Sequence, residues 1–184
     1  MASYTLKVAG LVRELPLCAV NEKLDIAAFI MFSDVELTVA CAEELIKKAP
    51  EFDVIVTAET KGIPLAYEMA RQTGKKYVVA RKSVKLYMRN PIEVTVKSIT
   101  TEAVQKLYLA EDEINLIKGK KVLIVDDVIS TGESLEAIKK LIESADGNIA
   151  GSCAVLAEGD AMDREDIFFL EKLPLFFKET ENQA

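Results

Sequence analysis

One stretch of the sequence decides the fold: Val122-Leu123-Ile124-Val125-Asp126-Asp127-Val128-Ile129-Ser130-Thr131-Gly132-Glu133-Ser134. Its beginning belongs to Lys121–Val125, an apolar run of the kind found in strands of a parallel sheet, buried on both faces. Two adjacent carboxylates follow, then a short loop of small hydroxyl residues with one glycine. A helix is predicted over Ser134–Ala145, which Gly147 closes. Strand, loop and helix together predict one βα unit of an α/β protein.

The loop between this strand and this helix has the composition of an anion-binding site. Successive backbone N–H groups at a helix start point toward one spot, where the helix dipole favours negative charge. Ser130, Thr131 and Ser134 add hydroxyl donors, and Gly132 lets the backbone turn tightly beside a phosphate. The loop is not a Walker A loop, since no GxxxxGK[ST] pattern occurs in the chain.

The paired acids Asp126 and Asp127 suggest a ligand beyond a simple anion. They follow the strand at its carboxyl end, where open α/β sheets bind ligands. Carboxylates there accept hydrogen bonds from sugar hydroxyls, and they hold Mg²⁺ directly or through water. The alternative is an ordinary βα turn in which Asp127 or Thr131 caps the helix.

Strands and helices alternate on both sides of this stretch, which indicates a doubly wound, mostly parallel sheet. A capping-box pattern at Ser33 opens a helix that runs to Ala49. Gly74 supplies the C-terminal stop of a further helix. The predicted elements besides Lys121–Val125 and Ser134–Ala145 are the strands Asp53–Ala58, Lys76–Ala80 and Ile149–Leu156 and the helix Ile63–Thr73.

Three segments lie outside the alternation. Tyr4–Val8 and Val12–Leu17 predict a hairpin around Gly10. Ser83–Asp112 is too long for an ordinary connection, and such insertions are often active-site lids. The tail predicts a small cap and a frayed end. Within the insertion, Val94–Thr101 and Lys106–Leu109 can pair as a mobile hairpin. In the tail, Asp160–Phe177 is the predicted cap and Lys178–Ala184 the predicted frayed end.

Composition excludes several classes of function. The chain has 184 residues, which suits one domain, and its net charge of −7 opposes non-specific nucleic-acid binding. It has no histidine, which removes Ser-His-Asp and Cys-His catalysis and the usual zinc sites. Cys18, Cys41 and Cys153 form no zinc pattern and are expected to be reduced. Without a signal-peptide pattern or a membrane-spanning run, we expect a cytoplasmic protein with no membrane contact.

The stretch Val122–Ser134 resembles the phosphoribosyl-diphosphate motif of type I phosphoribosyltransferases. The resemblance implies that Asp126 and Asp127 contact the ribose 2′- and 3′-hydroxyls and take part in binding Mg²⁺. It also implies that the loop holds the 5′-phosphate through Ser130, Thr131, Gly132, Glu133 and Ser134. Glu133 departs from the family pattern, because adenine-type members more often have glycine there.

Two further segments support this resemblance in the expected order. Thr57–Gly62 resembles the pyrophosphate loop, whose residues here are Glu59, Thr60, Lys61 and Gly62. Lys61 takes the place of a more usual arginine and loses the bidentate fork of a guanidinium. Arg81 and Lys82, directly after a predicted strand, resemble the basic pair that meets the pyrophosphate. In the insertion, Lys85, Tyr87, Arg89, Glu93 and Lys97 do not align with the family's catalytic loop.

The resemblance implies an organisation as well as a reaction. It implies a five-stranded sheet flanked by helices, in a single domain of residues 1–184 that is expected to form a homodimer. The core spans about 34–156, the flexible loop about 83–112, and a hood comes from residues 1–33 and 157–177. The catalytic residues expected are Asp126, Asp127 and Lys61.

The implied reaction is nucleotide salvage: transfer of the phosphoribosyl group from phosphoribosyl diphosphate to a nucleobase nitrogen. Members acting on 6-oxopurines often have an acid where this chain has Ser130, so the base expected is a purine such as adenine, with pyrimidines still open. The alternative is a non-catalytic regulator of the same fold that senses phosphoribosyl diphosphate or nucleotides. Some family members are repressors with a DNA-binding domain, but residues 1–50 show no basic helix-turn-helix character.

Overall fold

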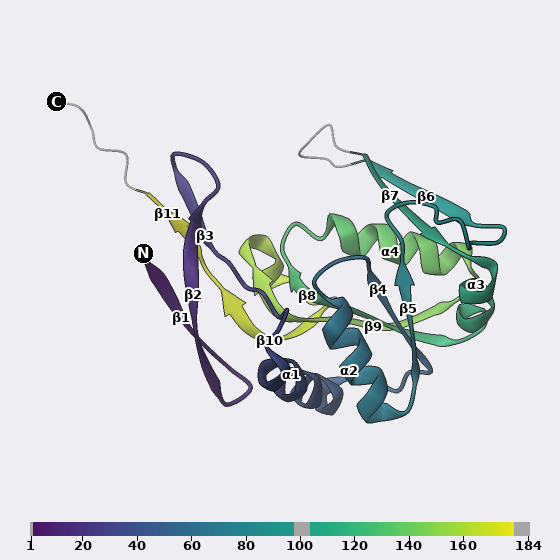
Figure 1. The fold of residues 1–184 in the computed structure, drawn as a ribbon, viewed down its shortest axis with the longest axis horizontal. Coiled ribbons are helices and arrows are strands. Elements are labelled where there is room, and N and C mark those ends of the chain that lie inside the picture. Colours follow the sequence, from purple (N-terminus) through teal and green to yellow (C-terminus); the bar gives the residue numbers. More distant parts are fainter. Residues whose placement is uncertain (1, 98–103, 179–184) are drawn as a thin grey trace.

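A five-stranded parallel sheet forms the core of the computed structural model, which describes residues 2–97 and 104–178. The strand order is β10-β9-β8-β4-β5, and all four pairings are parallel. The doubly wound parallel sheet predicted from the sequence is therefore confirmed (Figure 1). Its strands are β4 (Val54–Ala58), β5 (Lys76–Ala80), β8 (Lys121–Ile129), β9 (Asn148–Glu158) and β10 (Phe168–Leu173).

Helices cover both faces of this sheet, because the strands bury alternate side chains on opposite sides. Ile55 and Leu123 pack with α1 and α2 on one face, whereas Val56 and Ile124 pack with α3 and α4 on the other. Among the described residues, each helix is too short or too polar to cross a bilayer. The helices are α1 (Val35–Lys48), α2 (Ile63–Thr73), α3 (Glu111–Ile117) and α4 (Glu133–Ser144).

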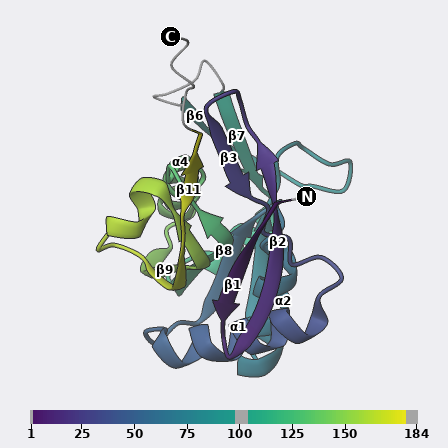
Figure 2. The ribbon, with the colours of Figure 1, turned by 90° about the vertical axis from the view of Figure 1, so that its left-hand side faces the viewer.

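A second, antiparallel sheet stands at one end of the core, and we call it the hood sheet (Figures 1 and 2). Its strand order is β1-β2-β3-β11, so the last strand joins the N-terminal strands. The rings of Tyr4 and Phe176, 5.4 Å apart, tie the two ends of the chain together. The strands are β1 (Ser3–Val8), β2 (Leu11–Ala19), β3 (Leu24–Ala27) and β11 (Leu175–Phe177), with a 3-10 turn η1 at Gly159–Asp163.

The predicted hairpin in the long insertion is present, as β6 (Ile92–Lys97) and β7 (Val104–Leu109). Residues 98–101 of the predicted first run lie outside the described residues, as does the frayed end after residue 178. The base of the hairpin belongs to the core, because Leu107 and Leu109 are buried beside α4. Arg81 and Tyr108 also exchange two backbone hydrogen bonds there, of 2.9 and 2.8 Å.

Three expectations from the sequence need correction, and two elements were missed. Asp34, not Ser33, is the N-cap of α1, and its carboxylate accepts the N–H of Leu37. Strand β8 continues through both acids to Ile129, because these residues still pair with β9. The tail is more than a cap, since β10 extends the core sheet. The short elements β3 and α3 were not predicted, because neither has a long periodic pattern.

Candidate active site

The loop after β8 has the geometry expected of an anion site. Gly132 is the N-cap of α4 with a left-handed φ of 78°, a conformation that glycine adopts without strain. It has no side chain to offer to the N–H groups of the first turn, which are the groups that bind anions at helix starts. Residues 128–135 and Asp126 surround a small hollow of about 60 Å³. The N-cap is thus Gly132 and neither Asp127 nor Thr131, although Thr131 Oγ1 accepts a long hydrogen bond of 3.5 Å from the N–H of Glu133.

Arg164 supports this loop from outside, although nothing in its sequence context marked it. A Cβ on residue 132 would overlap Nη1 of Arg164, so the guanidinium packs directly against the glycine backbone. The same guanidinium pairs with Asp166 at 2.7 Å and with Glu136 at 3.2 Å. Asp166 and Glu136 thus hold the positively charged guanidinium of Arg164 beside the loop, at the end of α4 where an anion is expected to bind.

The two acids of β8 occupy different environments. Oδ1 of Asp126 accepts hydrogen bonds from Thr60 Oγ1 at 3.1 Å and from the N–H of Asp127 at 2.9 Å. Asp127 is only 4% exposed. Its Oδ2 lies 3.5 Å from Lys61 Nζ but accepts no hydrogen bond from the residues that the structure describes. Since it also lines a cavity, this oxygen is available to a ligand.

The electrostatics of this pair favour a positively charged or hydrogen-donating ligand. Burial, and next the neighbouring charge of Asp127, raise the pKa of Asp126 above the ordinary aspartate value. Within the described residues, no cluster of three or more acidic, cysteine or histidine side chains forms a self-sufficient metal site. Two carboxylates fit Mg²⁺ in the other common way, in which phosphate oxygens and water supply the remaining ligands.

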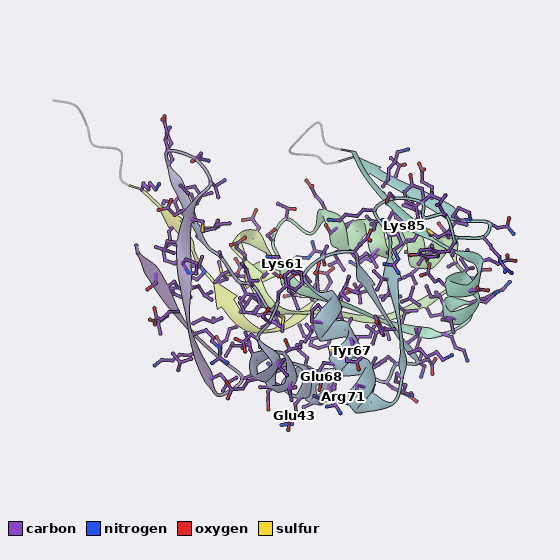
Figure 3. All side chains as sticks on the ribbon, in the orientation of Figure 1. Glu43, Lys61, Tyr67, Glu68, Arg71 and Lys85 are labelled. Atoms are coloured by element: carbon purple, nitrogen blue, oxygen red, sulfur yellow. The ribbon has the colours of Figure 1, made fainter. Side chains whose placement is uncertain are left out.

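The loop after β4 packs directly on these acids. Gly62 is the N-cap of α2, and a Cβ there would lie 2.8 Å from Asp126 Oδ1 and 3.1 Å from the N atom of Asp127. Lys61 links the acid pair to the hood side: its Nζ is 3.5 Å from Asp127 Oδ2 and donates to the carbonyl of Phe29 at 3.0 Å. Figure 3 shows Lys61 on the side of the core that faces the hood. The structure thus brings Thr60, Lys61 and Gly62 together with the acid pair, as the sequence order predicted.

Gly62→Ala should therefore reduce both stability and phosphoribosyl-diphosphate binding. The new methyl group must push Asp126 away, and such overpacking typically costs about 1–3 kcal/mol. Thermal melting and calorimetry with the ligand measure the two effects. Gly151→Ala is a matched control, because its Cβ would meet Pro50 at 3.1 Å, outside the site. Normal ligand affinity in Gly62→Ala would show that the close approach of the two loops is not needed for binding.

A basic cluster surrounds Glu59 beside this site. The carboxylate of Glu59 accepts the N–H of Lys82 at 2.9 Å and pairs with Arg81 at 3.7 Å. It also pairs with Lys85 at 3.4 Å, so Lys85 joins the cluster although its sequence position had no assigned role. Nε of Arg81 is buried and has no acceptor among the described residues. Glu59 therefore organises the cations, and a ligand anion would complete their pairing.

A cavity of about 400 Å³ joins the acid pair to the hood. One wall consists of site residues, and the opposite wall comes from the segment that connects β3 to α1. Several lining residues were not predicted, because isolated apolar residues and single acids carry no sequence signal. The lining residues are Ile26, Ala27, Ala28, Phe29, Ile30, Thr60, Lys61, Asp126, Asp127, Val128, Ser130, Ser134, Glu158 and Leu173.

This combination of an anion loop, an acid pair and a basic cluster at the strand ends of a doubly wound sheet defines a phosphoribosyl-binding class of α/β protein. The family model for the phosphoribosyl transferase domain matches residues 38–180. The chain belongs to this family, and its fold is the type I phosphoribosyltransferase fold.

Individual relatives agree with this assignment. The chain is 37% identical to an adenine phosphoribosyltransferase of Rhodococcus jostii over 127 residues, 68% of this chain and 69% of that protein. It is 32% identical to the purine biosynthesis transcriptional repressor PurR of Bacillus subtilis over 113 residues, 61% of this chain and 39% of the repressor. The crystal structure of an adenine phosphoribosyltransferase from Thermoanaerobacter pseudethanolicus has a TM-score of 0.66 and 25% identity, covering 77% and 84% of the two chains.

Proposed function

We propose that this protein transfers the phosphoribosyl group from phosphoribosyl diphosphate to a purine nitrogen, with adenine as the preferred base. The products are a nucleoside 5′-monophosphate and pyrophosphate, which places the reaction in nucleotide salvage. The observation that carries the proposal is one cavity lined both by the anion loop, through Ser130 and Ser134, and by the acids Asp126 and Asp127. The Rhodococcus relative, named as an adenine phosphoribosyltransferase, supports the choice of base.

Each part of the site has a role in this proposal. The loop from Ser130 to Ser134, including Thr131, Gly132 and Glu133, binds the 5′-phosphate. Asp126 and Asp127 hold the ribose hydroxyls and would hold Mg²⁺, which neutralises charge on the pyrophosphate when it is bound. The pyrophosphate lies near the cations of the loops after β4 and β5, which are Lys61, Arg81 and Lys82. Glu59, Thr60 and Gly62 of the loop after β4 position these cations and the backbone around the pyrophosphate.

The chemistry needs positioning more than covalent participation. A lone pair on the base nitrogen forms a bond to the anomeric carbon, and the bond from that carbon to the pyrophosphate oxygen breaks. The electron pair leaves with the pyrophosphate, and positive charge develops on the sugar in the transition state. The proton that the base nitrogen carried is released to the departing pyrophosphate or to water. Fixed carboxylates near the ribose and fixed cations near the leaving group stabilise this charge separation. Exclusion of water by a lid prevents hydrolysis.

Phosphoribosyl diphosphate should bind in an Mg²⁺-dependent way. The motivation is the acid pair, whose negative charges oppose an anionic ligand unless a cation lies between them. Calorimetry with Mg²⁺, and again with a chelator, measures the difference, which we expect to be at least about tenfold because one bridging ion contributes charge-assisted contacts worth about 1.5–3 kcal/mol. Equal affinity under both conditions would show that Mg²⁺ takes no part in binding.

A product assay across purine and pyrimidine bases tests the function itself. We expect adenine to be converted in the presence of phosphoribosyl diphosphate and Mg²⁺. The second candidate is a non-catalytic sensor of the same fold. One relative is named as a repressor, but the relatives named as adenine phosphoribosyltransferases do not favour this candidate. Tight binding of phosphoribosyl diphosphate with no conversion of any base would support the sensor and contradict the enzyme.

We also propose that residues 1–184 act as a single cytoplasmic domain that forms a homodimer. An exposed apolar surface on α1, α2 and the residues just before α1 supports the dimer. We define it by Phe32, Val35, Val39 and Tyr67, which are between 36% and 74% exposed and line one shallow hollow. Contiguous apolar surface of this kind often marks a protein interface. Light scattering of the purified protein measures the oligomeric state, and a monomer at all concentrations would contradict it.

A further inference from the structure

One polar side chain in the 400 Å³ cavity has no role in binding phosphoribosyl diphosphate. Six of the polar lining residues belong to the phosphate, ribose and pyrophosphate positions described above. The rest of the lining is apolar, from residues 26–30 of the hood, Val128 and Leu173, except for Glu158. A largely apolar pocket with one carboxylate is suited to a flat heterocycle that carries a hydrogen-bond donor.

The sheet places Glu158 beside the ribose position. It is the last residue of β9, whose neighbour Ala157 pairs with Ile129 of β8. On the other side it pairs with Leu173 of β10, which also lines the cavity. The carboxyl group therefore lies at the same edge of the sheet as Asp126 and Asp127, one strand further toward the hood.

Glu158 is available for a ligand. It is half-buried, and it makes no side-chain hydrogen bond or ion pair with any residue that the structure describes. Burial raises its pKa, and the nearby charge of Lys61 acts in the opposite direction. A partly desolvated carboxylate without hydrogen-bond partners costs free energy. A ligand that donates a hydrogen bond to it would remove this cost and bind more tightly.

We propose that the carboxylate of Glu158 accepts a hydrogen bond from the exocyclic amine of a 6-aminopurine, and that this contact makes the site prefer aminopurines to oxopurines. The inference rests on the proposed function and assigns its preference for adenine to one residue. An ionised carboxylate only accepts hydrogen bonds. An amine at C6 donates, whereas an oxo group at C6 would place a second acceptor against the carboxylate. A site that must pair a buried polar group discriminates strongly against a base that cannot pair it.

Two substitutions at this position separate recognition from packing. Glu158→Gln keeps the size of the side chain but adds a donor, which an oxopurine can use. Glu158→Leu removes both donor and acceptor. We expect the ratio of kcat/KM for adenine to that for hypoxanthine to fall about 10- to 100-fold in either variant, the range for one charge-assisted hydrogen bond. The affinity for phosphoribosyl diphosphate should change less than about threefold, since the pyrophosphate and phosphate contacts remain.

Calorimetry with AMP and IMP measures the same preference without turnover. Wild type should bind AMP more tightly than IMP, and Glu158→Gln should lose at least about tenfold of this preference. Glu171→Gln is the matched control, because Glu171 lies exposed on the neighbouring strand β10 and makes the same change of charge. It should leave both ratios unchanged.

The outcomes separate this inference from the proposed function. If wild type converts no base but its AMP preference depends on Glu158, the proposed transfer is wrong and the recognition role stands. If wild type converts adenine and Glu158→Gln keeps the wild-type base preference, Glu158 has no role in choosing the base. Equal losses for adenine and hypoxanthine, accompanied by weaker binding of phosphoribosyl diphosphate, would mean that Glu158 only holds Lys61 in place, and the inference falls.

Discussion

The double substitution Asp126→Asn/Asp127→Asn should lower turnover by on the order of 100-fold or more, because each carboxylate contributes a charge-assisted hydrogen bond worth about 1.5–3 kcal/mol to the bound sugar or its metal. An amide oxygen still accepts hydrogen bonds, but it carries no charge to stabilise the developing positive charge on the ribose. The measurement is steady-state conversion of adenine with saturating phosphoribosyl diphosphate.

The fold should survive this change and even gain stability. Asn at position 126 can still accept from Thr60 Oγ1 and from the N–H of residue 127, which are the bonds that the carboxylate makes now. It also relieves the repulsion between two partly buried acids. Without ligand, the variant should therefore melt at a higher temperature than wild type at neutral pH, as is common where site residues are strained for function.

The pH dependence of stability gives an independent check on the acid pair. Because burial and then the Asp127 charge raise the pKa of Asp126, the native state keeps a proton that the unfolded chain has released. Wild-type stability should then fall as pH rises from about 4, the ordinary aspartate pKa, toward neutral. In the Asn pair this slope should flatten.

Asp146→Asn is a suitable control for charge and composition. Asp146 is exposed at the far end of the sheet, and its left-handed φ of 55° suits Asn equally well. The turnover of the Asp146→Asn variant should match that of wild type. If the folded Asp126/Asp127 variant also turned over normally, the assignment of the ribose to these acids would be wrong.

The sequence predicted the core elements well because their signals are local. Strands such as Lys76–Ala80 are short apolar runs, and α2 ends at Gly74, whose φ of 67° matches the predicted glycine stop. The Ser33 cap was wrong because Asp34, one residue later, offers a carboxylate that also pairs with Arg13 at 2.7 Å. That pairing joins segments distant in the sequence, so a local pattern could not reveal it.

Prediction of the site was limited in the same way. The loop at Gly132 and the acids before it form one continuous motif, so the sequence could propose them together as a site. Glu158, Phe29 and Arg164 come from separate segments, and only the pairing of β9 with β8 and the packing of the tail bring them to the loop. The role of Glu59 as a centre for Arg81 and Lys85 likewise depends on the contact of two loops.

The outer part of the β6–β7 hairpin should be required for base transfer but not for binding of phosphoribosyl diphosphate. Figure 1 shows the hairpin and the hood on opposite sides of the strand ends that carry the site. A lid contributes mainly after ligand binding, since it excludes water and completes the site around an occupied pocket. Its removal should therefore lower transfer about 100-fold, the typical cost of a misplaced reactant.

The structure shows where the hairpin can be cut. Leu107 and Leu109 are buried, and Glu93 pairs with Lys106 at 2.9 Å, so these residues must stay. Thr95 and Lys106 face each other in the register. Replacing residues 96–105 with Asn-Gly joins them through a two-residue turn of the type that hairpins prefer. A Gly-Ser replacement of the same ten positions at unchanged length separates the effect of length from that of the side chains.

We expect the short variant to bind phosphoribosyl diphosphate with nearly wild-type affinity and to lose transfer, because the loops that we propose to hold the phosphates follow β4, β5 and β8. The variant of unchanged length should bind equally well and transfer partly, since it keeps the length of the proposed lid but lacks its specific side chains. Full transfer activity in the short variant would show that the outer part of the hairpin is not needed for the reaction. Loss of ligand binding in a folded short variant would instead show that the hairpin forms part of the phosphoribosyl site itself, through its contact with Arg81 at Tyr108.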